Sequence, residues 1–168
     1  SWLTLSFLPG PATADAATGN AVLLPGSGWL AGRGVDVISN GLASTTVWGN
    51  SYAVTPGGLR VYAGYEWQCV ELTMRFMAQV YGVSAYSANG NEVVRNYSQS
   101  YGGGLVKVNN GSPGQPPLPG DIISFDRAGA LGHAGVVSAT SIDANGNGSL
   151  TMLSQNDSAD GLRTLGVA

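Results

Sequence analysis

The chain contains a single thiol and a single imidazole, and both lie in distinctive settings. Cys69 lies in the segment E-W-Q-C-V-E-L, and His133 lies further along the chain in L-G-H-A-G-V-V. The thiolate is the nucleophilic form of cysteine, and an imidazole with a pKa near 6.5 can accept and return a proton at neutral pH. Together these two side chains could carry out nucleophilic catalysis on an acyl group.

The third polar group of such a site is predicted by the pairing of two strands. If Ile142 and Ser149 flank a turn, His133 lies opposite Ser158, and Asn156 lies diagonal to it on the same face. Diagonal neighbours are about 7–8 Å apart, which is within reach of polar side chains. The amide oxygen of Asn156 could then hold the second ring nitrogen of His133 and orient the ring.

The electrostatic setting of Cys69 favours its ionised form. A helix N-terminus and a neighbouring imidazolium both lower a thiol pKa from about 8.5. The backbone N–H of Cys69, unpaired in the first helical turn, could also stabilise an oxyanion. Two alternatives stay open at this point: a lone cysteine packed in the core, and a lone histidine with a structural role.

A helix over residues 67–81 is predicted to position the thiol. Four side chains repeat at steps of three, four and four residues, which places them on one helical face: Cys69, Leu72, Phe76 and Val80. Gly82 is a natural helix end. Glu71 and Arg75 are spaced for a favourable pair on another face, and a shorter helix is predicted over residues 92–97.

Strands are predicted mainly after the helices. Residues 121–125, 133–142 and 150–155 read as strands, with D-A-N-G-N-G at 143–148 as the turn between the last two. A short strand is also expected within residues 34–41. Helices followed by an antiparallel meander indicate an α+β fold.

Composition limits the possible functions. The chain has 168 residues, enough for one domain, with a net charge of −3 and a pI near 4.8. The absence of a basic stripe argues against nucleic-acid binding. One Cys and one His provide no cluster of metal ligands, so neither a metal nor a cofactor is expected.

The N-terminal residues bear on location. Residues 2–8 are mostly apolar and are followed by small residues that include A-T-A at 12–14, as in the rear of a secretory signal peptide. Residues 1–16 are therefore predicted to be a signal remnant, the alternative being an ordinary N-terminal strand. Residues 17–28 are predicted to be a lead-in linker and residues 29–168 the functional domain. The expected location is secreted or in the cell wall, with no membrane association after signal cleavage.

Several motifs together resemble one family, the CHAP domains, which are cysteine, histidine-dependent amidohydrolases/peptidases. These motifs are W-Q-C-V-E-L at 67–72, P-G-D-I-I at 119–123, G-H-A-G-V-V at 132–137 and L-S-Q-N-D at 153–157. The segment G-V-D-V-I-S-N-G at 34–41 is similar to the lead-in of secreted actinobacterial members.

The resemblance implies a papain-like α+β fold, in which an N-terminal helix carrying the cysteine packs on an antiparallel sheet carrying the histidine and asparagine. It assigns Cys69 as nucleophile, His133 as general base and acid, and Asn156 as the orienting group. The implied substrate is bacterial peptidoglycan, cut between muramic acid and L-alanine or within its peptides. The protein is expected to be a monomer.

Two departures from the family pattern stand out. Many members have Glu two residues before the Asn, where this chain has Ser154, so no carboxylate is expected there. The chain also stops at 165–168, where the family usually continues through a final strand. We therefore expect truncation at the C-terminus and an exposed sheet edge.

The sequence thus favours an exported cysteine hydrolase that cleaves an amide bond in peptidoglycan. Two alternatives use the same residues or scaffold: a non-catalytic module that binds the wall or a partner, and an acyl-transfer enzyme.

Overall fold

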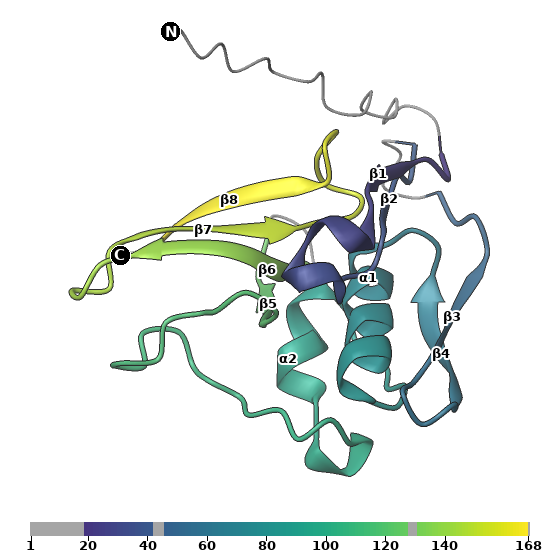
Figure 1. Cartoon of the computed structure of the whole chain (residues 1–168), viewed down its shortest axis with the longest axis horizontal. Coiled ribbons are helices and arrows are strands. Elements are labelled where there is room, and N and C mark those ends of the chain that lie inside the picture. The colour runs from purple at the N-terminus through teal and green to yellow at the C-terminus, as the bar shows by residue number, and fades with distance from the viewer. Residues whose placement is uncertain (1–18, 42–45, 128–130, 168) are drawn as a thin grey trace, which may run out of the picture.

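The computed structural model describes residues 19–41, 46–127 and 131–167 (Figure 1). The predicted signal remnant at 1–16 lies outside the described residues. The strands are β1 (Val22–Leu24), β2 (Val37–Ile38), β3 (Asn50–Val54), β4 (Arg60–Tyr65), β5 (Ile122–Phe125), β6 (His133–Ile142), β7 (Gly148–Leu153) and β8 (Leu162–Val167). The helices are α1 (Cys69–Phe76) and α2 (Val93–Asn96), with a π-helical turn η3 (Met77–Tyr81) and short 3-10 turns η1 (Gly26–Gly28), η2 (Leu30–Gly32), η4 (Gly90–Glu92) and η5 (Gln99–Tyr101).

Helix α1 lies between the four-stranded sheet β5–β8 and the hairpin β3–β4 (Figure 1). The predicted α+β class with antiparallel sheets is confirmed, and the arrangement is consistent with a papain-like domain. None of the helices in the described part of the chain is long and apolar enough to cross a membrane.

The predicted long helix is present but changes geometry along its length. Leu72 and Phe76 are fully buried on the face that the sequence pattern identified. The α-helical part ends at Phe76 and continues as η3, and Gly82 ends the helix in a left-handed conformation, with φ of 74°. The apolar period therefore located the helix but did not distinguish the α from the π turn.

The four-stranded sheet is antiparallel throughout, in the order β5–β6–β7–β8. Leu162–Val167 form β8, which pairs with all of β7 and lies at the edge of the sheet. The expected continuation of the family fold beyond residue 168 stays a prediction. The predicted lead-in also contains a strand, because Val22–Leu24 pair with Val37–Ile38.

The predicted register of the β6–β7 hairpin was wrong at the turn. Ser141, not Ile142, pairs with Ser149. A bulge between Val137 and Ala139 then shifts the pairing by one more residue, so that Val136 lies opposite Leu153. A shift of one residue turns the side chains of a strand to the opposite face of the sheet, and a second shift turns them back. The inner part of the hairpin therefore keeps the faces that the predicted register gave it. The pairing of β6 with β7 ends at Val136 and Leu153, so the start of β6 and the loop after β7 lie at the same end of the sheet.

A buried polar cluster joins α1 to the surrounding elements. The Glu71 carboxylate, fully buried, accepts hydrogen bonds from Arg75 Nε (2.5 Å), Ser51 Oγ (2.7 Å) and Gln155 Nε2 (2.8 Å). The spacing of Glu71 and Arg75 predicted their pairing, whereas only the tertiary structure places both of them inside.

The same cluster reaches the segment around β2. Arg75 Nη2 donates to the carbonyl oxygen of Asp36 (2.9 Å), and Ile38 N donates to Gln155 Oε1 (2.9 Å). Gln155 Nε2 also contacts the carbonyl oxygen of Gln68 (3.2 Å), the residue before Cys69. The loop after β7 is thereby fixed to the start of α1.

Removing one member of this buried pair should destabilise the fold strongly. We expect Arg75→Ala to lower the free energy of unfolding by about 3–5 kcal/mol, because Glu71 would stay buried without its charged partner. Arg95 provides a matched control, since it forms a helical pair with Glu92 but its side chain is 66% exposed. Arg95→Ala should cost less than about 1 kcal/mol. Urea unfolding measures both values, and equal losses would contradict the importance of the cluster.

Candidate active site

Cys69 is the first residue of α1, and Gln68 is its N-cap. The Cys69 sulfur lies where the backbone amides of Ala134, Val70 and Cys69 itself can donate to it. Ala134 directly follows His133 at the start of β6. The structure therefore brings the start of the helix and the start of this strand together.

The protonation state of the free thiol differs from the sequence-based expectation. Burial raises the pKa of Cys69 and outweighs the three amide hydrogen bonds, which lower it; the negative charge of Asp157 raises it further. The prediction of an ionised sulfur was therefore wrong. Desolvation of the thiol outweighs the stabilisation of the thiolate by the helix N-terminus. The free protein holds Cys69 as a thiol at neutral pH.

His133 begins β6 and is only 3% exposed. Its ring packs edge-on against Phe125, with the ring centroids 5.8 Å apart. The glycine before it is required by the packing: Gly132 has φ of 60°, and a Cβ there would lie 2.3 Å from Asn91 Cβ. These constraints give a physical reason for the glycine that precedes His133 in the motif.

Burial also controls the charge of His133. It lowers the pKa of the ring to about 4, aided by the nearby cations Arg127 and Arg163 and opposed by Asp157. His133 is therefore neutral at pH 7. A neutral imidazole can accept a proton and so act as a general base.

The hydrogen-bond partners of His133 come from the loop that follows β7. His133 Nε2 lies 2.6 Å from Ser154 Oγ and 3.7 Å from Asp157 Oδ2. Ser154 Oγ in turn donates to Asp157 Oδ2 at 3.2 Å. Sequence reasoning treated Ser154 only as a departure from the family pattern and gave Asp157 no role.

Asp157 is held by two guanidinium groups. Arg163 Nη1 lies 2.8 Å from both carboxylate oxygens, and Arg127 Nη1 lies 2.5 Å from Oδ1. Burial alone would raise the pKa of Asp157, but the hydrogen bond from Arg163, the positive charges of Arg163 and Arg127, and its interaction with His133 lower it overall. Asp157 is therefore a carboxylate at neutral pH.

Asn156 lies between these residues in the same loop. Its backbone is left-handed, with φ of 58°, and its Nδ2 donates to Gln68 Oε1 at 2.7 Å. Asn156 thus contacts the N-cap residue next to Cys69. Its assignment as the third member of the catalytic set stays a prediction.

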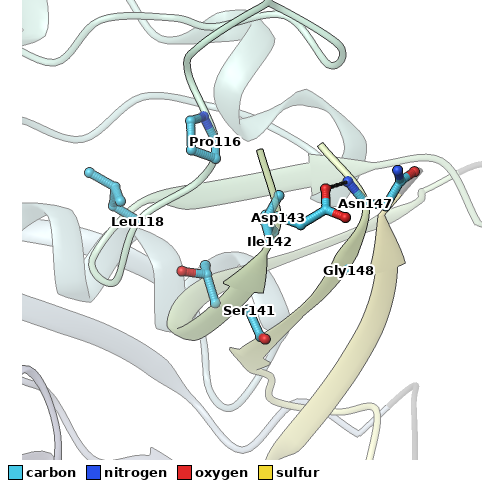
Figure 2. A pocket seen from close by; sticks show the side chains of 8 residues that line it. Pro116, Leu118, Ser141, Ile142, Asp143, Asn147 and Gly148 are labelled. Carbon is cyan, nitrogen blue, oxygen red and sulfur yellow. Dashed lines mark hydrogen bonds between the residues drawn. The ribbon is translucent and has the colours of Figure 1, made fainter. Parts of the chain in front are cut away.

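A pocket of about 610 Å³ lies elsewhere on the molecule (Figure 2). Pro116 and Leu118 line it from one side, and Ile142, Asp143 and the residues around Gly148 line it from the hairpin. It is located at the far end of β6 from His133, roughly 30 Å away along the strand at about 3.3 Å per residue. This pocket is therefore separate from the candidate site.

Side chains able to bind a metal do not cluster in the described part of the chain. Across residues 19–41, 46–127 and 131–167, no group of three or more His, Cys, Asp and Glu side chains is placed to hold an ion.

A family model described as CHAP domain matches residues 60–156, which is more than half of the chain. The matched segment contains Cys69, His133 and Asn156. The chain belongs to the CHAP domain family. CHAP domains are typically cysteine- and histidine-dependent amidohydrolases or peptidases that act on peptidoglycan. A comparison with curated proteins gave no match.

The low pKa of His133 predicts a loss of stability in mild acid. Between pH 6.5 and about 4 the unfolded chain binds a proton at His133 while the folded protein does not. The free energy of unfolding should therefore fall by on the order of 3 kcal/mol over this range. Melting temperatures measured at steps of pH for the wild type and His133→Gln test this, because the variant lacks the titrating group. An equally steep fall in the variant would assign the effect to other residues.

The raised pKa of Cys69 predicts slow alkylation at neutral pH. Iodoacetamide reacts with thiolates, so labelling of Cys69 should follow its ionisation. We expect the midpoint of rate against pH to lie above that of a small-molecule thiol such as N-acetylcysteine, used as the control. Since Cys69 is the sole cysteine, mass spectrometry of the intact protein reports its labelling directly. A midpoint below that of the control thiol would show that the free site is an ion pair.

Proposed function

We propose that this protein is an exported cysteine hydrolase that cleaves an amide bond in bacterial peptidoglycan. The observation that supports this most directly is the meeting of the start of α1 with the start of β6, which brings Cys69 next to the backbone of the His133 segment. Membership of the CHAP domain family supports the class of substrate. Export and the secreted actinobacterial type are parts of the same proposal.

In the proposed reaction, His133 takes the proton of the Cys69 thiol as the sulfur attacks the carbonyl carbon of the amide. The tetrahedral oxyanion accepts a hydrogen bond from the backbone N–H of Cys69, in the first turn of α1. His133 then gives the proton to the amide nitrogen, the C–N bond breaks, and an amine leaves. A thioester remains on Cys69.

Water completes the reaction. His133 removes a proton from a water molecule that attacks the thioester, and the proton passes to the sulfur as the carboxylic acid leaves. Asn156 is proposed as the third polar group, and its hydrogen bond to Gln68 supports a role in fixing the residue next to the nucleophile. The amide is either the bond between muramic acid and L-alanine or a bond within the stem or cross-bridge peptides.

A non-catalytic module that binds the cell wall is the second candidate. The raised pKa of Cys69 favours it, because a protonated thiol is a poor nucleophile until a base removes its proton. The two functions differ in whether wall material is released or only bound.

Digestion of purified peptidoglycan tests the proposal. We expect the wild type to release soluble muropeptides with new amino or carboxyl ends, and Cys69→Ala to reduce the release by about 1,000-fold or more, because the nucleophile is lost. Liquid chromatography with mass spectrometry identifies which bond is cut.

Arg95→Ala is the control, since Arg95 is exposed and lies outside the proposed site. It should release the same products as the wild type. Undiminished release by Cys69→Ala would exclude thiol catalysis, and binding to walls without any release by the wild type would favour the second candidate.

A further inference from the structure

The loop after β7 carries two side chains, Ser154 and Asp157, that form a chain of hydrogen bonds ending on His133. We propose that they act as a positioning relay, which holds His133 with its proton on Nε2 and leaves Nδ1 free to accept the proton of Cys69. The catalytic use of this arrangement rests on the proposed hydrolase function, whereas the orientation of the ring does not.

The direction of the hydrogen bonds follows from their chemistry. The Asp157 carboxylate has no proton at neutral pH and can only accept, so the Ser154 hydroxyl donates to it at 3.2 Å. The oxygen of Ser154 is then left with lone pairs toward His133 Nε2, 2.6 Å away. A neutral ring satisfies this contact only by carrying its proton on Nε2.

Burial makes this arrangement strict. Ser154 is fully buried, and the Asp157 side chain is only 2% exposed. Water is therefore a poor substitute for either partner, and an unpaired group in this position would carry its full desolvation cost. Moving the ring proton from Nε2 to Nδ1 would place the Nε2 lone pair against the lone pairs of the Ser154 oxygen and lose the bond.

Arg127 and Arg163 allow Asp157 to orient the His133 ring without making the ring positively charged. A carboxylate in direct contact with the ring would favour a protonated imidazolium. Here a hydroxyl lies between them, Asp157 is 3.7 Å from Nε2, and Arg163 and Arg127 offset its charge. The relay can thus orient the ring while the ring stays neutral and able to accept a proton.

The backbone of the loop places both relay residues. Ser154 N donates to the carbonyl oxygen of Gly161 at 2.9 Å, which anchors the loop at its base. The left-handed conformation of Asn156 then turns the chain sharply before Asp157, and asparagine tolerates this conformation better than most residues. The turn brings the carboxylate of Asp157 to the hydroxyl three residues earlier.

Nitrogen NMR tests the relay directly, because the chain has one histidine and its signals need no assignment among others. In uniformly ¹⁵N-labelled wild type at pH 7, long-range ¹H–¹⁵N correlations should show the neutral tautomer protonated at Nε2. Ser154→Ala should give a mixture of tautomers. Asp157→Asn should do the same and should also lower the pKa of His133 further, since the charge that favours the imidazolium is removed.

Two controls lie in the same loop. Ser158→Ala removes a buried hydroxyl that has no hydrogen-bond partner in the structure. Asp160→Asn changes a carboxylate that accepts a hydrogen bond from Leu162 N and does not contact His133. Both should leave the tautomer and the pKa of His133 unchanged.

The outcomes separate the relay from the hydrolase function. The relay would be overturned if His133 of the wild type carried its proton on Nδ1. It would also be overturned if Ser154→Ala and Asp157→Asn both folded and both kept the wild-type tautomer. The wild-type measurement tests the relay even if a variant does not fold. On peptidoglycan, Ser154→Ala should lower kcat/KM by about 10–100-fold with KM little changed. Absence of hydrolysis by the wild type would overturn the proposed function and leave the NMR result standing.

Discussion

The fold depends on one buried ion pair. Glu71 and Arg75 lie inside the domain, where charges are costly unless every polar atom finds a partner. The partners come from three other places in the chain: Ser51 in β3, Gln155 after β7, and the backbone around β2. Satisfying this pair therefore fixes how the hairpin, the sheet and the N-terminal strands sit around α1. Because Gln155 lies between Ser154 and Asn156, the same constraint fixes the loop that meets His133.

Three consecutive side chains of that loop enter three different networks. Ser154 contacts His133, Gln155 enters the buried ion-pair cluster, and Asn156 contacts Gln68. The stability of the core and the geometry of the site are thus supplied by neighbouring residues. In the free protein at neutral pH the thiol of Cys69 and the imidazole of His133 are both uncharged.

Local patterns in the sequence were sufficient for much of this architecture. The apolar repeat located α1, the D-A-N-G-N-G turn located the β6–β7 hairpin, and the start of β6 at His133 was predicted correctly. The family was also evident from the motifs around Cys69 and His133. The rest depends on tertiary contacts: burial reverses the expected shift of the Cys69 pKa, and the bulge after Val137 leaves no clear signal in residue types. The contacts of Asp157 with His133, Arg127 and Arg163 depend on the turn at Asn156 and on the tertiary structure, so residue types alone did not reveal them.

The same bulge divides the β6–β7 hairpin into two parts whose registers differ by one residue. The inner part is held by β5, by the loop after β7 and by the ion-pair cluster, whereas the outer part ends in the turn beside the pocket of Figure 2 and projects away from α1 (Figure 1). A change in the length of the outer turn can be absorbed at Ser138 without rotating His133 out of place. The tip of the hairpin is therefore a suitable position for grafting a peptide tag or a targeting sequence onto this domain.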